Sequence, residues 1–217
     1  MNIGLIRVRT IEKIEALDNH GPLIEKAFPG LKVKCCCIED QPFGIYDEKT
    51  EAIAIPKVIK LAKGLKGVDA IIIDCAADPG ASELKRELPI PVIGAGESLA
   101  YVSKTLGNAV GAITITERIP DIVAKVLGKN LIAYKKVEGV KTGLDLELEA
   151  SYRNTFDAAE ELIGQGCNVI ALACTGFATI GIGPKIGKEL KIPMVDPILA
   201  AGSMAYNLML NQEGHLF

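Results

Sequence analysis

The stretch Gly67–Gly80, GVDAIIIDCAADPG, predicts the fold of this chain. Residues Ala70–Ile73 within it are apolar and mostly β-branched, a pattern typical of a buried parallel strand. The strand leads into Cys75, and the next residues, Asp78 and Pro79, are the types that favour an N-cap and a first helical position. The sequence therefore predicts a thiol at the carboxyl end of a strand, just before a helix. Ligands bind at this edge of open α/β sheets, and a helix N-terminus favours a thiolate over a thiol.

A second stretch repeats this construction. Gly166–Gly176, GCNVIALACTG, is again an apolar strand that ends in a cysteine, Cys174. Each cysteine is followed by an expected helix, which is Lys185–Lys191 in the second copy, and then by a proline-containing strand. Two copies related by a pseudo-twofold axis would turn Cys75 and Cys174 toward one cleft.

Strands that alternate with helices predict an α/β fold of two lobes, each a parallel four-stranded sheet flanked by helices. We expect the active site in the cleft between the lobes. The first lobe is expected to comprise residues 1–97 and 197–217, and the second residues 98–196. A helix over Ser98–Leu106 is expected to cross between them, and a last helix over Ile198–Leu210 to pack back on the first lobe.

Other segments of the chain fit the same pattern. Ile11–Phe28 predicts a helix that His20-Gly21-Pro22 interrupts or restarts. Ile38–Thr50 has no period and predicts a long loop, and Glu138–Asp145 predicts its counterpart in the second lobe. Long loops in α/β folds often cover binding sites.

The composition narrows the class of protein. A formal net charge of −3 without a basic stripe gives little support to nucleic-acid binding, and no apolar run is long enough for a membrane span. Met1–Gly4 leads directly into an expected strand, without the pattern of a signal peptide. We therefore expect a cytoplasmic location, where the six cysteines stay reduced. We expect a small-molecule substrate, no nucleic-acid or membrane partner, and a homo-oligomer.

The remaining titratable side chains favour packing roles. The only histidines are His20 and His215, so the sequence argues against a histidine base and against a His-rich metal site. Successive residues of a strand point to opposite faces, so Cys35-Cys36-Cys37 cannot converge on a metal and is expected to pack in the interior. We expect Cys167 to be structural, Asp78 to cap a helix, and Glu97 to be either a helix N-terminal charge or a site residue.

Several motifs together resemble the aspartate/glutamate/hydantoin racemase superfamily, and its hydantoin and allantoin branch in particular. The signature after the first cysteine strand is Cys75–Gly80, CAADPG, and the one around the second cysteine is Ala173–Gly176, ACTG. The stretches Pro91–Glu97 and Pro193–Pro197 and the loop Pro42–Glu51 also match, so the resemblance covers most of the chain. Three features depart from it: Arg7-Val8-Arg9-Thr10 after the first strand, Ala76-Ala77 in place of Phe-Gly, and Thr175.

The resemblance implies a racemase or epimerase that needs neither a cofactor nor a metal. One cysteine thiolate would remove a proton from a carbon next to a carbonyl, and the other thiol would deliver one to the opposite face. The enolate would be held by backbone N–H groups at Ala76-Ala77 and Thr175-Gly176. Polar groups of the substrate would be bound at strand ends, for which the candidates are Arg7, Thr114 and Thr116.

The sequence leaves alternatives open for both the substrate and the class of function. The Asp78-Pro79-Gly80 signature favours a 5-substituted hydantoin over a free amino acid, although Thr175 is common in the amino-acid racemases. Decarboxylation or cis–trans isomerisation of small dicarboxylates also occurs on these lobes. A non-catalytic protein that binds small anions, and a thiol redox protein, are the rivals from other classes.

Overall fold

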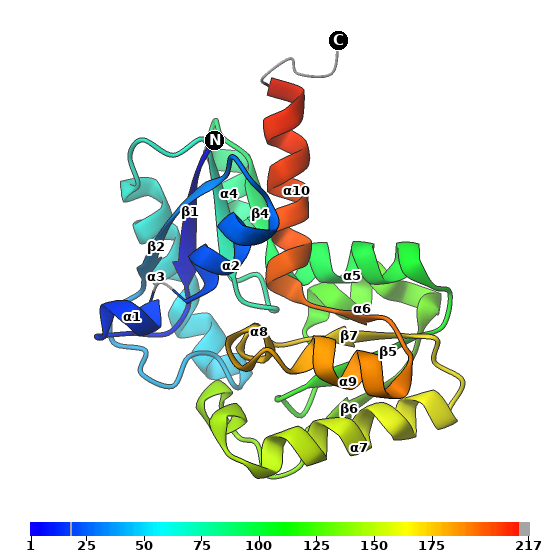
Figure 1. Ribbon diagram of the computed structural model, residues 1–217. Coiled ribbons are helices and arrows are strands. Elements are labelled where there is room, and N and C mark those ends of the chain that lie inside the picture. The colour runs from blue at the N-terminus through cyan, green and yellow to red at the C-terminus, as the bar shows by residue number, and fades with distance from the viewer. Residues whose placement is uncertain (18, 213–217) are drawn as a thin grey trace.

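The computed structural model describes residues 1–17 and 19–212, so His215 lies outside the described part of the chain. It contains two parallel four-stranded sheets with equivalent strand orders, β2-β1-β3-β4 and β6-β5-β7-β8 (Figure 1). The expected α/β architecture is therefore confirmed. The first sheet consists of β1 (Asn2–Arg7), β2 (Lys32–Cys37), β3 (Ala70–Asp74) and β4 (Val92–Gly94). The second consists of β5 (Val110–Thr114), β6 (Leu131–Lys136), β7 (Val169–Leu172) and β8 (Met194–Val195).

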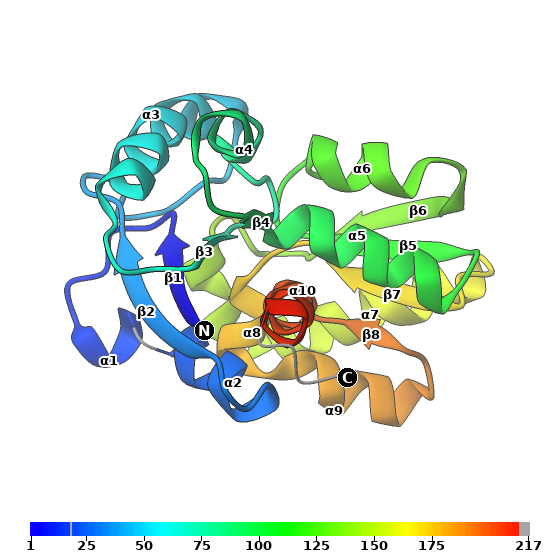
Figure 2. The same ribbon diagram turned by 90° about the horizontal axis from the view of Figure 1, so that it is seen from above.

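Helices cover both faces of each sheet, as Figure 2 shows from above. Those before β4 are α1 (Ile14–Leu17), α2 (His20–Ala27), α3 (Glu48–Gly64) and α4 (Ala81–Glu87). They are followed by α5 (Ala95–Leu106), α6 (Asp121–Leu127), α7 (Ala150–Gly164), α8 (Gly176–Ile180), α9 (Ile182–Leu190) and α10 (Pro197–Gln212). Two short 3₁₀ turns are η1 (Gly128–Asn130) and η2 (Gly143–Glu147). Across residues 1–17 and 19–212, none of the helices combines the length and apolar character that crossing a membrane requires.

The central strands are buried on both faces, which explains their continuous apolar sequences. In β3, Ile72 packs with Leu5 and the apolar side of α10, whereas Ile71 and Ile73 pack with side chains of α3 and α4. In the second sheet, Ile170 packs beneath α7 and α9, and the neighbouring residues of β7 pack beneath α5 and α6. β3 and β7 are inner strands of their sheets, and the residues that follow their carboxyl ends line one cavity.

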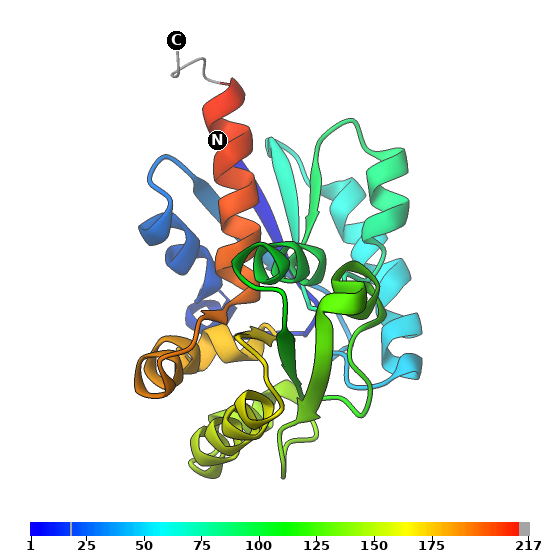
Figure 3. The same ribbon diagram turned by 90° about the vertical axis from the view of Figure 1, so that its right-hand side faces the viewer.

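Two helices link the sheets. Helix α5 leaves β4 and contributes Leu99 and Ala100 to the apolar cluster of the second sheet. Helix α10 returns to the first sheet, where Ile198 and Ala205 pack with residues of β1, and Figure 3 shows this red helix beside the blue first strand. These contacts support the division into residues 1–97 with 197–217 and residues 98–196, which stays a prediction.

Some helix boundaries differ from the sequence predictions. Ile11–Phe28 forms the short helix α1 and then α2, which begins at His20, rather than one long helix. Pro22 explains the restart, because it lies in the first turn of α2, where a backbone N–H is not needed for the helix. After Cys174 the chain forms two helices, α8 and α9, where we expected one over Lys185–Lys191.

The prediction that Asp78 and Pro79 open the helix after Cys75 is wrong. Helix α4 begins at Ala81, after Gly80, whose φ of 73° is in the region that favours glycine. The Asp78 carboxylate instead caps α5, accepting hydrogen bonds from the backbone N–H groups of Gly96 (2.8 Å) and Glu97 (2.7 Å). A side chain at Gly94 would lie 2.2 Å from this carboxylate, so the contact requires glycine there.

Asp78 therefore caps a helix, as expected, but one that follows the next strand. Glu97 lies in the first turn of α5 and forms an ion pair with Lys85. Of the two roles considered for Glu97, the structure places it as a charge at a helix N-terminus.

Burial of Asp78 predicts a pH-dependent stability. Burial raises the pKa of Asp78 to about 7, and the two N–H groups that it accepts from only partly oppose this rise. The folded state therefore holds this proton at pH values where the unfolded chain has lost it. The free energy of unfolding should fall as the pH rises from about 4 to about 7, by roughly 1.4 kcal/mol per unit of pKa difference.

The measurement is urea unfolding of the wild type and of Asp78→Asn at several pH values. Because asparagine does not titrate, the stability of the variant relative to the wild type should improve across this pH range. Parallel pH profiles of the two proteins would contradict the buried, proton-binding Asp78.

Candidate functional site

A cavity of about 100 Å³ lies at the carboxyl ends of the central strands, and residues of both sheets line it. Cys75 comes directly after β3, and Cys174 comes two residues after the end of β7. Both line this one cavity. The sequence repeat thus brings the two cysteines together, as the pseudo-twofold interpretation requires. The other lining residues are Arg7, Val8, Arg9, Phe43, Gly44, Ile45, Asp74, Ala76, Ala77, Ile115, Thr116, Pro120, Gly143, Glu147, Ala173, Thr175, Gly176 and Thr179.

The two thiols are held mostly in the protonated form. Burial raises the pKa of Cys75 well above its usual value, against a backbone hydrogen bond from Ala77 that lowers it. Burial likewise raises the pKa of Cys174 to about 11, although the Gly176 N–H donates to its sulfur over 3.4 Å. The expectation that helix N-termini favour thiolates is therefore wrong for this site. Helix α4 begins only at Ala81, and desolvation outweighs the N–H groups near each sulfur.

The thiols also influence one another. The charge of a Cys174 thiolate raises the pKa of Cys75. Ionisation of one sulfur therefore favours the protonated state of the other. Such a pair supplies one base and one acid at a time.

The other predicted site residues are brought together with one exception. Ala76, Ala77, Thr175, Gly176, Arg7 and Thr116 line the cavity. Thr114 does not, because it is fully buried and its hydroxyl is hydrogen-bonded to Thr116 Oγ1 over 2.9 Å. Arg7 lines the cavity, but its guanidinium already has protein partners.

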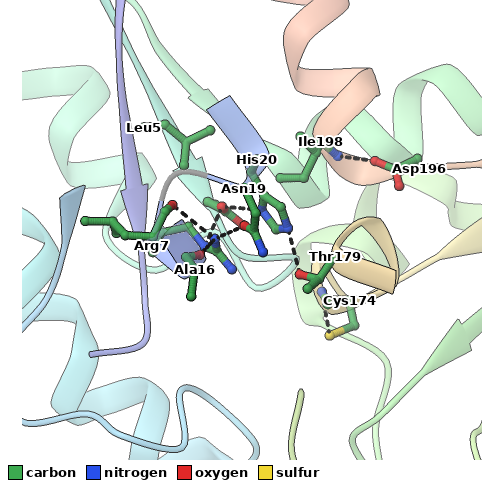
Figure 4. A network of polar contacts seen from close by, with 12 residues as sticks. Leu5, Arg7, Ala16, Asn19, His20, Cys174, Thr179, Asp196 and Ile198 are labelled. Carbon is green, nitrogen blue, oxygen red and sulfur yellow. Dashed lines mark hydrogen bonds and ion pairs between the residues drawn. The ribbon is translucent and has the colours of Figure 1, made fainter. Parts of the chain in front are cut away.

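A buried polar network beside the cysteines was not predicted from the sequence (Figure 4). Asp74, the residue before Cys75, accepts from Arg7 Nε over 3.0 Å and contacts His20 Nδ1 over 2.7 Å, both through Oδ2. Arg7 also donates to Asn19 Oδ1 over 2.6 Å. His20 Nε2 lies 2.9 Å from Thr179 Oγ1 in α8, so the network joins the first sheet to the helix that follows Cys174.

This network accommodates a buried negative charge. Burial by itself would raise the pKa of Asp74, but the positive charges of His20 and Arg7 hold it below its usual value. Asp74 Oδ1 makes no hydrogen bond within the described residues, although the Thr175 hydroxyl is near enough to favour the ionised form. The signal for this arrangement in the sequence is Asp74, an acidic residue directly after an apolar run and before Cys75.

The two long loops enclose the cavity. The first contributes Phe43, Gly44 and Ile45, and the second contributes Gly143 and Glu147 from η2. Both loops therefore border the cavity, and the role of the first loop as a cover for the site stays a prediction.

The cysteine run on β2 does not take part in this site. Cys35 packs with the apolar cluster on one face of the sheet and Cys36 with the cluster on the other, which confirms the alternation. The thiols are half-buried rather than buried, because β2 is the edge strand of its sheet. Cys37 Sγ accepts from the Ile11 N–H over 3.4 Å, and Cys167 is buried in the core of the second sheet.

Alanine substitutions in this run should affect stability and leave catalysis intact. Cys36 should show this most clearly, because its thiol donates to the Leu5 carbonyl over 3.4 Å and packs beneath α3. We expect Cys36→Ala to lower the free energy of unfolding by about 1 kcal/mol, with kcat/KM unchanged. A normally folded Cys35→Ala, Cys36→Ala or Cys37→Ala variant with a reduced chemical rate would show that the run belongs to the site.

Comparison with known proteins gives consistent matches. The model of the Asp/Glu/hydantoin racemase family matches residues 23–205. The hydantoin racemase of Pseudomonas sp. (strain NS671) is 28% identical over 180 residues, which is 77% of this chain and 70% of that protein. The hydantoin racemase of Paenarthrobacter aurescens is 26% identical over 172 residues, which is 76% of this chain and 72% of that protein.

The fold also matches solved structures. The allantoin racemase from Klebsiella pneumoniae superimposes with a TM-score of 0.84 at 23% sequence identity, covering 97% of this chain and 88% of that one. At this identity, the similarity shows that the two chains share a fold.

Proposed function

The chain belongs to the Asp/Glu/hydantoin racemase family, and from that premise we propose that it racemises 5-substituted hydantoins with Cys75 and Cys174 as its two acid–base groups. Membership of this family makes the protein a racemase. The observation that carries the two-cysteine mechanism is that both thiols, one from each sheet, line the same cavity. Inversion of a carbon requires groups on both faces of the substrate, and strand ends of two opposed sheets can supply them.

The high pKa values of the thiols have two opposing effects on this chemistry. A carbon next to a carbonyl is a weak acid, so its proton is removed faster by a stronger base. A thiolate whose parent thiol has a pKa of about 11, as Cys174 has, is a stronger base than an ordinary cysteine thiolate, but only a small fraction of it is present near neutral pH. The reactive form is therefore the minor one, in which one cysteine has lost its proton to solvent and the other keeps its own. After proton removal, the opposite cysteine, still protonated, donates to the other face. After this step the first cysteine is a thiol and the second a thiolate, so the enzyme is ready to convert the product enantiomer back with the two roles exchanged.

Backbone N–H groups beside the cysteines can stabilise the enolate. Ala76 and Thr175 directly follow the two cysteines and line the cavity. In the described part of the chain their N–H groups donate to no protein acceptor. Fixed donors of this kind stabilise the negative charge that develops on the carbonyl oxygen.

The preference for a hydantoin has two supports. The Asp78-Pro79-Gly80 turn after Cys75 is the sequence signature that favours this branch. The proteins of Pseudomonas sp. (strain NS671) and Paenarthrobacter aurescens to which this chain is similar are hydantoin racemases. An amino acid of the aspartate or glutamate type is the alternative substrate, which Thr175 and the wider family favour.

A substrate screen in D₂O tests this proposal. Single enantiomers of 5-substituted hydantoins and of aspartate and glutamate are incubated with the protein, and loss of optical rotation is followed together with deuterium uptake. We expect enzyme-dependent racemisation of at least one hydantoin, with deuterium at the inverted carbon. Racemisation of amino acids alone would reassign the substrate, and binding without deuterium uptake would support a non-catalytic anion-binding protein.

A further inference from the structure

Arg9 places a positive charge in the cavity wall that the two-cysteine mechanism does not use. It follows β1 and lines the cavity together with Cys75 and Cys174. Its side chain makes no ion pair or hydrogen bond with the rest of the described chain. Arg7, two residues earlier, is by contrast held by Asp74, Asn19 and two backbone carbonyls. Of the two arginines at this strand end, Arg9 is the one available to a ligand.

Arg9 is partly buried in the cavity wall, and charged groups from both sheets lie near it. Burial and the neighbouring Arg7 lower the pKa of Arg9, while Glu147, Asp74 and Cys37 raise it. Glu147 belongs to the second sheet's loop and the others to the first sheet, so the guanidinium is within electrostatic reach of both sides. A partly desolvated cation beside a second cation is stabilised by a bound anion.

Part of the cavity wall around Arg9 is apolar. Val8, Phe43, Ile45, Ile115 and Pro120 form the apolar part of the same cavity. Asp74, the negative group deepest in the site, is already compensated by Arg7 and His20. Among the described residues that line the cavity, Arg9 is the cation without an ion-pair partner, and it shares the wall with apolar side chains and with the unpaired Glu147. A single acidic group on a ligand would pair with this cation.

We propose that Arg9 binds a carboxylate of the substrate, so that the preferred hydantoins carry an acidic substituent at C5. This inference rests on the proposed racemase function and specifies its substrate class. Arg9 acts here as a specificity residue, because it binds a part of the substrate that does not react. A planar guanidinium also matches the two oxygens of a carboxylate in a bidentate contact.

Glu147 provides a second variant, whose expected effect on substrate binding is opposite to that of the Arg9 variant. Its side chain is exposed, forms no ion pair within the described residues, and lies near enough to raise the pKa of Arg9. Its negative charge opposes the approach of an acidic substrate. Removal of that charge should therefore strengthen binding of the acidic substrate, whereas removal of the Arg9 charge should weaken it.

The test compares 5-(carboxymethyl)hydantoin with 5-(carbamoylmethyl)hydantoin, which have nearly the same shape and differ in charge. The wild type should have the larger kcat/KM for the acid. In Arg9→Gln the acid-to-amide ratio of kcat/KM should fall about 10- to 100-fold, the range of one charge-assisted hydrogen bond. Arg9→Lys should retain much of the ratio, and Glu147→Gln should raise it.

The matched control is Arg118→Gln. Arg118 pairs with Glu48 on the surface and does not line the cavity, so its removal should leave the ratio unchanged. An equal or larger kcat/KM for the amide in the wild type, or the same ratio in Arg9→Gln as in Arg118→Gln, would overturn the inference while the hydantoin racemase function stands.

The same variants separate the two possible sources of the carboxylate. If neither hydantoin is racemised but aspartate is, and Arg9→Gln lowers that rate, then Arg9 binds a carboxylate as inferred and the hydantoin substrate is wrong. If aspartate is racemised at the same rate by Arg9→Gln and the wild type, both the hydantoin substrate and the role of Arg9 are wrong.

Discussion

Cys75→Ser and Cys174→Ser should each lower kcat/KM for racemisation at least about a hundredfold, since general acid–base groups contribute roughly 10²–10⁴. A serine hydroxyl has nearly the size of a thiol but is far too weak an acid to ionise near neutral pH. Each variant thus lacks the group on one face of the substrate, and inversion needs both. The fold should be unaffected, because both side chains line a cavity and are only partly buried.

A double variant and a control variant at a cysteine outside the cavity test whether Cys75 and Cys174 act as one unit. Cys75→Ser combined with Cys174→Ser should lose little more racemisation than either single change, because residues that act as a unit are strongly non-additive. Cys36→Ser is the control, since Cys36 lies outside the cavity and a hydroxyl can still donate to the Leu5 carbonyl. Racemisation retained at the wild-type rate by either single variant would reject the two-thiol mechanism.

The second large effect concerns stability. Asp74→Asn should lower the free energy of unfolding by about 3 kcal/mol or more, as expected when one partner of a buried ion pair is removed. Arg7 and His20 both contact Asp74 through the same oxygen, Oδ2, over 3.0 and 2.7 Å. An asparagine oxygen in that position preserves both contacts, so the loss measures the missing charge rather than missing hydrogen bonds.

A surface ion pair provides the comparison for Asp74. Glu48 pairs with Arg118 over 2.9 Å, and both side chains are well exposed. Glu48→Gln should therefore change the free energy of unfolding by at most about 1 kcal/mol. Chemical unfolding of the two variants under identical conditions makes the comparison. Equal losses would show that the charge of Asp74 does not stabilise its buried contacts with Arg7 and His20.

The features predicted from the sequence are those that depend on local pattern and repetition. The apolar runs Ala70–Ile73 and Val169–Leu172 lie at the centres of two equivalent sheets, where strands need apolar residues on both faces. Because a cysteine follows each run at the same distance, two residues after its end, the repeat alone predicts that Cys75 and Cys174 lie at equivalent strand ends. The shared cavity follows from that equivalence.

The features that were missed depend on contacts between distant residues. His20 reaches Asp74 and Thr179, which are 54 and 159 positions away, and no local pattern reports such pairs. Asp78 caps α5 rather than its own helix for the same reason. The thiol pKa values were predicted in the wrong direction, because the sequence indicates a nearby helix but not how deeply the cysteines are buried.

Arg9 illustrates both cases. The sequence marks Arg7-Val8-Arg9-Thr10 as a departure from the family pattern after the first strand. Alternation in β1 does not distinguish the two arginines, since positions 7 and 9 would point the same way. The structure distinguishes the two arginines, because β1 ends at Arg7 and only Arg7 forms an ion pair with Asp74.

The central claim is that the two thiols face opposite sides of one carbon atom, and the most direct test is hydrogen exchange by the single variants in D₂O. Each enantiomer of a racemised substrate is incubated separately with Cys75→Ser and with Cys174→Ser, and deuterium at the reacting carbon is measured by NMR before any inversion. The remaining cysteine can remove the proton that it faces and return a solvent deuteron to the same side. We predict that each variant exchanges one enantiomer without inverting it, and that the two variants exchange opposite enantiomers. Exchange of the same enantiomer by both variants would contradict the claim, because the two cysteines would then lie on one side of the reacting carbon.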